Sequence, residues 1–144
     1  MPIDPTQPYD DNNVFARILR GELPSKKVYE DDFAFAFHDI NPLAPVHILV
    51  IPKGSYVSWD DFSERASDEE IAGFIRAVGR IAREEGLVAQ GYRILANIGM
   101  RGGQEVPHLH AHIFGASLSG RCSRARGLPS RAEPLGSAAN LSAI

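Results

Sequence analysis

Cysteine, long apolar runs and targeting signals are nearly absent from this sequence of 144 residues. The single cysteine, Cys122, excludes an internal disulfide and a cluster of thiolate metal ligands. The longest uninterrupted apolar run is 33–37, far short of the ~20 residues that a membrane-spanning helix requires. The first residues also lack the basic and then apolar pattern of a signal peptide, so we expect a cytoplasmic protein with no membrane partner.

Positive charge is not in excess either. Lysine and arginine total 15 against 18 for aspartate and glutamate, which gives a net charge of -3. This balance argues against a nucleic-acid partner, because counterion release needs a surplus of basic residues. Hydrophobic residues make up 44% of the chain, enough for a packed core, and the length suits one domain.

Both ends of the chain differ in composition from the middle. Residues 1–11 contain three prolines and three aspartates and few apolar side chains, so a flexible arm is expected there. Residues 116–144 contain no aromatic residue, and we expect 119–144 to form an irregular tail. The folded domain is therefore placed at 12–118.

Two helices are predicted from apolar residues at helical spacing. Asn12 or Asn13 caps a short helix whose apolar residues are Val14, Phe15, Ile18 and Leu19. Ser67 and Glu70 match a capping box, which starts a longer helix that ends near Gly86. The longer helix has a continuous apolar stripe and should cover a sheet.

Five strands are predicted between and after these helices. The ranges 27–30 and 33–38 form an antiparallel hairpin, and 47–51 reads as a central strand buried on both faces. The ranges 92–97 and 108–114 follow, separated by a glycine-rich loop. The sum is an α+β fold with a five-stranded, mostly antiparallel sheet.

All five histidines lie in two stretches of the chain, around the predicted second and third strands and on the last strand. Side chains alternate between the faces of a strand, so one face of the last strand should carry three imidazole rings, His108, His110 and His112. Burying three titratable rings is costly unless each has a partner, so this pattern favours a functional site over a plain strand face.

Metal catalysis is one interpretation of these rings. Two histidines at i and i+2 on a strand could bind one zinc ion at about 2.0 to 2.1 Å each. His108 and His112 are, however, about 13 Å apart along a strand, so all three rings cannot easily converge. No aspartate or cysteine pattern completes the set, and no metal is predicted.

Nucleophilic catalysis is the other interpretation. A neutral imidazole can attack phosphorus or a carbonyl carbon and form a covalent intermediate. The glycine-rich loop 99–103 precedes the histidines and exposes backbone N–H groups that could bind phosphate oxygens. Asn97 and Gln104 would add neutral donors, so phosphorus is the favoured target.

The sequence resembles the histidine triad nucleotide-binding proteins, whose signature is His-x-His-x-His followed by two apolar residues. That signature stands here at 108–114 as HLHAHIF. Similar segments occur in the same order at 15–18, 37–42, 44–53 and 102–106. The resemblance covers about residues 12–118, and the joint match is highly specific.

By this resemblance the protein would be a purine nucleoside phosphoramidase that cleaves the P–N bond between a nucleoside monophosphate and an amine. His110 would be the nucleophile that becomes nucleotidylated. His112 would contact the phosphate and the leaving group, while His47 and His108 would orient the nucleophile. The resemblance implies no cofactor.

The resemblance also implies a nucleotide pocket for a purine nucleotide, as an AMP or GMP conjugate. Asp39 would accept hydrogen bonds from the ribose hydroxyls. The base would be surrounded by Phe15, Ile18, Phe37, His38 and Ile40, although the apolar members of this set could equally be core residues. The phosphates would be flanked by Asn97, Gly103, Gln104, Glu105 and Val106, with Glu105 contributing its backbone N–H because its carboxylate would repel phosphate.

Members of the family are typically homodimers built by the long helix and a neighbouring strand, so a homodimer is implied here too. Two other functions stay open from the sequence. A dinucleoside polyphosphate hydrolase would use the same histidines on a P–O–P bond. A nucleotide-binding module for protein interaction would bind tightly with little turnover.

Overall fold

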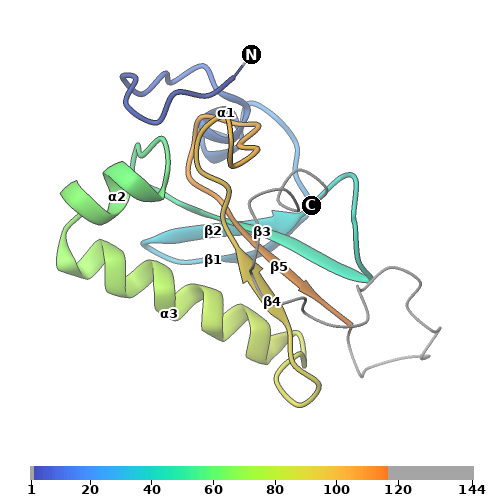
Figure 1. The fold of residues 1–144 in the computed structure, drawn as a ribbon. Helices are drawn as coiled ribbons and strands as arrows, with labels where there is room; N and C mark the ends of the chain where they lie inside the picture. Colours follow the sequence, from blue (N-terminus) through green and yellow to red (C-terminus); the bar gives the residue numbers. More distant parts are fainter. Residues whose placement is uncertain (1, 117–144) are drawn as a thin grey trace.

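The computed structural model describes residues 2–116, which form one antiparallel sheet with helices packed on it (Figure 1). The strand order is β1-β2-β3-β5-β4. The α+β class and the five-stranded sheet are therefore confirmed. No helix in this part of the chain is long and apolar enough to span a membrane. The elements in chain order are α1 (Val14–Leu19), β1 (Lys27–Glu30), β2 (Ala34–His38), β3 (Val46–Pro52), α2 (Trp59–Arg65), α3 (Asp68–Glu84), β4 (Arg93–Leu95) and β5 (Ala111–Gly115).

The two faces of the sheet carry two separate hydrophobic clusters. Alternate residues of β2 and β3 point to opposite faces, as expected for strands buried on both sides. One face packs on α3 through side chains such as Ile48, Val50 and Phe74. The other face packs on α1 (Figure 1) through Phe15 and its neighbours. This second face also carries His47, His110 and His112.

The helices begin where the capping residues predict. The Asn13 side chain accepts a hydrogen bond from the Ala16 N–H at 2.9 Å, and Ser67 forms a reciprocal capping box with Glu70. The helix α2 was not predicted, although Ser58 and Asp61 form a second capping box at its start. The pattern Ser-x-x-Asp was available in the sequence as its signal.

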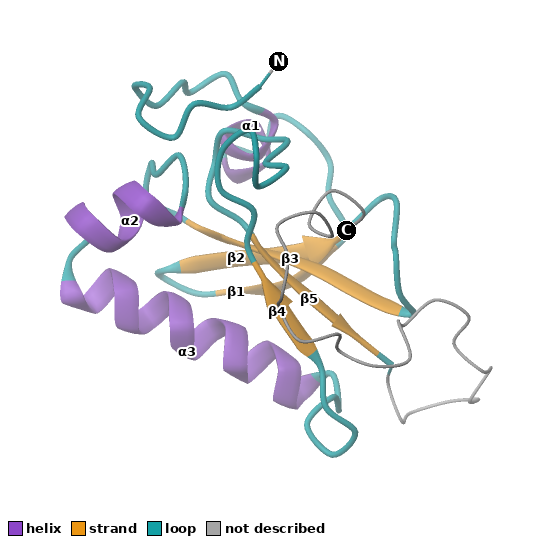
Figure 2. Cartoon of the chain, in the orientation of Figure 1, coloured by secondary structure: helices purple, strands orange, loops and turns teal. Residues whose placement is uncertain are grey.

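The predicted hairpin and the central position of β3 are confirmed, but the last two strands are shorter than expected (Figure 2). The ladder between β3 and β5 begins at Val50 opposite Ala111. Before that point the Leu109 N–H donates to the Tyr56 carbonyl at 2.9 Å instead of to a strand. His108 and His110 therefore precede β5, and only His112 lies within it.

The segment 2–11, for which the composition predicts a flexible arm, contacts the rest of the domain at three residues. Ile3 is only 7% exposed, and Pro5 packs against the backbone of Gly99. Tyr9 makes a hydrogen bond with His108 at the centre of the histidine cluster. A few well-placed apolar and aromatic side chains are enough to attach the segment. The expected tail at 119–144 lies outside the described residues.

Candidate active site

A cleft of about 260 Å³ opens on the histidine-bearing face of the sheet. Its walls come from the loop before β3, from β3, β4 and β5, and from the glycine-rich loop after β4. It is lined by Asp39, Asn41, Leu43, His47, Leu95, Asn97, Gly103, Glu105, His110, His112 and Phe114. Segments that are about 70 residues apart in the sequence thus form one site.

Seven of the predicted site residues line this cleft, namely Asp39, His47, Asn97, Gly103, Glu105, His110 and His112. The others lie elsewhere. Phe15 and Phe37 are buried in the hydrophobic cluster beneath the site, with Ile18 and Val106 packed against it. His38 is exposed, and Ile40 is 88% exposed, so neither is enclosed in a base pocket.

His110 is held in one tautomer by a hydrogen bond to the backbone. Its Nδ1 lies 2.7 Å from the carbonyl oxygen of His108. A carbonyl oxygen can only accept, so Nδ1 carries the proton and Nε2 keeps a free lone pair. Burial lowers the pKa of His110 and favours this neutral form. The ring of Phe15 meets His110 edge-on at 5.0 Å between centroids and fixes its plane.

His108 supports His110 and is itself completely buried. Its Nε2 lies 2.9 Å from the carbonyl oxygen of Pro52, so Nε2 carries the proton in this ring. Burial lowers the pKa of His108 to about 4, which keeps the ring neutral at pH 7. Because its backbone carbonyl orients His110, His108 acts through its position and not through titration.

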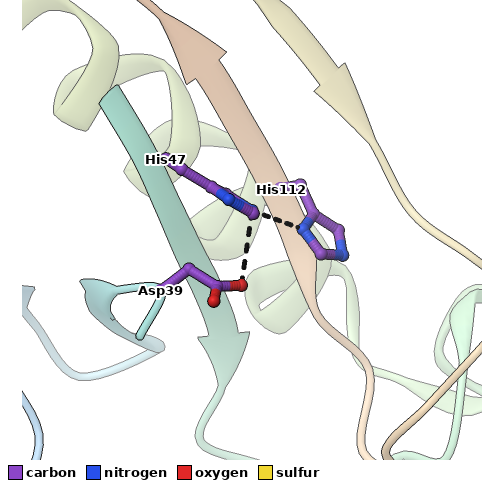
Figure 3. Close-up of side chains that lie close together, drawn as sticks. All are labelled: Asp39, His47 and His112. Carbon is purple, nitrogen blue, oxygen red and sulfur yellow. Dashed lines mark hydrogen bonds and ion pairs between the residues drawn. The ribbon is translucent and has the colours of Figure 1, made fainter. Parts of the chain in front are cut away.

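A chain of hydrogen bonds passes from the Leu43 backbone through His47 to His112. Figure 3 shows the bond between the two rings. The Leu43 N–H donates to His47 Nδ1 at 3.1 Å, so the proton of neutral His47 is on Nε2. His47 Nε2 then donates to His112 Nδ1 at 2.9 Å. The proton of neutral His112 must therefore be on its own Nε2.

His112 Nε2 is the one buried side-chain nitrogen or oxygen within residues 2–116 that lacks a hydrogen-bond partner. Burial, followed by the nearby His110 and His47, lowers the pKa of His112 to about 3. The ring of Phe114 stacks parallel to it, 5.6 Å away between centroids. An oriented N–H without a partner is a site ready to donate to an oxygen or nitrogen of a bound molecule.

Asp39 completes a group of possible metal ligands with His47 and His112, whose ligand atoms all lie within 4.8 Å of one another (Figure 3). Asp39 Oδ2 is 3.4 Å from His47 Nε2. This carboxylate was not expected in such a set. A metal on His47 Nε2 would require the proton to move to Nδ1, where it would face the Leu43 N–H. The hydrogen bonds present therefore fit a proton on this nitrogen better than a metal.

Gln104 does not supply the free donor that the sequence suggested. Its side chain is buried, with Oε1 accepting from the Gly99 N–H at 2.9 Å. Its Nε2 donates to the carbonyls of Val57 and Val106 at 2.6 and 3.0 Å. Since both of its N–H donors are used within the protein, the Gln104 side chain shapes the glycine-rich loop and has no donor left for phosphate.

Two residues of the site had no signal in the sequence. Leu43 contributes only its backbone N–H, which no side-chain pattern reveals. Tyr9 lies in a segment whose composition indicated no packing, 99 positions away from its partner His108. Only the folded chain brings these groups to the histidines.

Comparisons with known proteins agree with this fold. The sequence matches the HIT domain over residues 20–117. A HIT-like protein of Azospirillum brasilense is 67% identical over 106 residues, which cover 74% of this chain and 87% of that protein. The purine nucleoside phosphoramidase of Escherichia coli K12 is 40% identical over 119 residues, covering 82% of this chain and 98% of the relative.

Solved structures are similar as well. A histidine triad protein from Clostridium difficile superimposes with a TM-score of 0.64 at 43% identity, covering 75% of this chain and 93% of that one. A HIT family hydrolase from Clostridium thermocellum gives a TM-score of 0.65 at 36% identity, covering 77% and 96%. The chain belongs to the HIT family, and the resemblance seen in the sequence is confirmed.

Proposed function

We propose that this HIT-family protein is a hydrolase that cleaves the P–N bond of purine nucleoside 5'-phosphoramidates through a nucleotidyl-histidine intermediate. The single observation that carries the proposal is the tautomer of His110. Its Nδ1 donates to the His108 carbonyl, which leaves a lone pair on Nε2 of a neutral, buried ring. The 40% identity to a relative named purine nucleoside phosphoramidase supports the choice of substrate.

The reaction follows from the two nitrogens that the structure leaves available. His110 Nε2 attacks phosphorus and forms a P–N bond to the enzyme, while the P–N bond to the leaving amine breaks. We assign the proton for the leaving amine to His112 Nε2, which has no partner among the described residues. Water then attacks the same phosphorus and returns a proton to His112 Nε2. The P–N bond to His110 breaks, and the nucleoside monophosphate leaves with both rings neutral again.

The remaining cleft residues would bind the ribose, the phosphates and the base of the nucleotide. Asp39 retains accepting capacity after its Oδ1 binds the Asn41 N–H at 2.8 Å, which suits ribose hydroxyls. Asn97 and Gly103 line the part of the cleft near the glycine-rich loop, where phosphate oxygens would lie. The purine would rest over the cluster that contains Phe15 and Phe37. The dimer stays part of the proposal, with Ile94 on the edge strand β4 half exposed and available to a partner copy.

The test is hydrolysis of an adenosine 5'-phosphoramidate by the wild type, by His110→Ala and by Gln90→Ala, all with excess chelator. Gln90 is exposed in a turn, does not line the cleft and serves as the control. We expect activity in the wild type and the control, and none in His110→Ala. Rapid denaturation of the wild type at alkaline pH, where the P–N bond to histidine is stable, should show one added nucleotidyl group.

Other results would refute the proposal in different ways. Loss of wild-type activity on chelation would indicate a metal on Asp39, His47 and His112. Cleavage of a dinucleoside polyphosphate but not of the phosphoramidate would indicate a P–O–P hydrolase. Nucleotide binding with no turnover of either substrate would indicate a binding module.

A further inference from the structure

The N-terminal segment reaches the histidine cluster through one side chain. The hydroxyl of Tyr9 makes a hydrogen bond with His108 Nδ1, and the two rings meet edge-on at 5.5 Å between centroids. Tyr9 is partly buried and does not line the cleft. It therefore touches a residue that supports the nucleophile without reaching the substrate.

The direction of this hydrogen bond is fixed by the opposite nitrogen of the ring. The Pro52 carbonyl can only accept, so the proton of neutral His108 is on Nε2. The lone pair on Nδ1 then accepts from the Tyr9 hydroxyl. Both ring nitrogens are thereby anchored, one to β3 and one to the N-terminal segment. No other donor to His108 Nδ1 exists among the hydrogen bonds of residues 2–116.

The segment is also held at a second point beside the site. Pro5 packs against Gly99, where a Cβ would come within 3.3 Å of its ring. Gly99 has φ +68°, and its N–H is bound by Gln104, so the contact lies on the glycine-rich loop. Ile3, which is 7% exposed, anchors the start of the segment. Packing at Ile3 and Pro5 therefore holds the segment that carries Tyr9.

We propose that Tyr9 is a positioning residue that fixes the ring of His108, and through its backbone carbonyl the reactive orientation of His110. This inference rests on the proposed function. If the Tyr9 hydroxyl is removed, His108 keeps one anchor, and its carbonyl has more freedom relative to His110 Nδ1, 2.7 Å away. Fewer molecules then present Nε2 to phosphorus, so the chemical step slows while nucleotide binding is unaffected.

The kinetic test compares Tyr9→Phe with Tyr29→Phe. Tyr29 donates its hydroxyl to Asp31 at 2.7 Å, far from the cleft, so this control also loses one tyrosine hydrogen bond. For Tyr9→Phe we expect roughly a tenfold lower kcat with KM changed less than about twofold, measured well below the melting temperature. Tyr29→Phe should keep the wild-type kcat. A Tyr9→Phe variant with a lower melting temperature and an unchanged kcat would overturn the proposal, because the contact would then be only structural.

A spectroscopic test begins with the wild type, and this first part does not depend on whether the variant folds. In protein labelled with ¹⁵N-histidine, His108 should be protonated at Nε2 and His110 at Nδ1. Protonation of His108 at Nδ1 would overturn the proposal. In Tyr9→Phe, we expect the Nδ1 signal of His108 to shift and His110 to show a mixture of tautomers. These signals report on the orientation of the His108 and His110 rings even if the wild type has no phosphoramidase activity. A lack of activity would refute the proposed reaction but not the role of Tyr9 in positioning His108.

Discussion

Replacement of Gln104 by leucine tests the finding that this side chain builds the site without binding the ligand. Leucine has a similar volume but cannot form any of the three hydrogen bonds of Gln104. The Gly99 N–H and the Val57 carbonyl are both buried and would lose their partners. The glycine-rich loop would then be detached from the segment that leads into α2.

The size of the effect follows from these two buried groups. Each buried donor or acceptor left without a partner costs about 1–3 kcal/mol, so Gln104→Leu should destabilise the protein by roughly 2–6 kcal/mol. Urea unfolding followed by circular dichroism measures this loss. Gln90→Leu is the matched control, because Gln90 is exposed in a turn. We expect that substitution to change the free energy of unfolding by less than about 0.5 kcal/mol.

The activity of the variant gives a second readout. Gly103 and Glu105 flank Gln104 in the wall of the cleft, so a loosened loop should raise KM for a phosphoramidate more than it lowers kcat. If Gln104→Leu unfolds at the same urea concentration as the wild type, the hydrogen bonds assigned to Gln104 do not stabilise the loop. If stability is unchanged while activity is lost, the direct contact with phosphate suggested by the sequence would be correct.

Two further predictions concern the acid stability of the fold and the ribose contact. The pKa is about 4 for His108 and about 3 for His112, against an ordinary value near 6.5, so these rings stay neutral in the folded protein while the unfolded chain takes up protons as pH falls. Stability should therefore be constant above about pH 6.5 and fall below it. Between pH 7 and pH 5 each ring should lower the free energy of unfolding by about 2 kcal/mol. Urea unfolding at the two pH values measures this loss as a lower midpoint. An unchanged midpoint would contradict the assignment of buried neutral histidines. Asp39→Ala should raise KM more than it lowers kcat, because Asp39 is placed to hold the ribose and not the reacting bond. Steady-state kinetics with a phosphoramidate measures the two parameters separately. A large fall in kcat at unchanged KM would show that Asp39 acts instead through His47, whose Nε2 is 3.4 Å from Asp39 Oδ2.

The sequence by itself determined the elements whose signals are local. The caps at Asn13 and Ser67 predicted where α1 and α3 begin, because a helix start needs a side-chain acceptor within three residues. The short apolar run at 47–51 predicted β3 as a central strand buried on both faces. The spacing of the three histidines predicted the family, which the comparisons confirm.

Which groups meet around those histidines is set by the three-dimensional fold. The tautomers of His47 and His110 depend on the backbone groups of Leu43 and His108, and backbone groups carry no signature in a sequence. The role of Gln104 as a loop support depends on a carbonyl 47 positions away. The attachment of Tyr9 to His108 depends on a contact across 99 positions. Such contacts are set by how the packed elements are arranged in space, because hydrogen bonds need a particular distance and direction that local patterns do not specify.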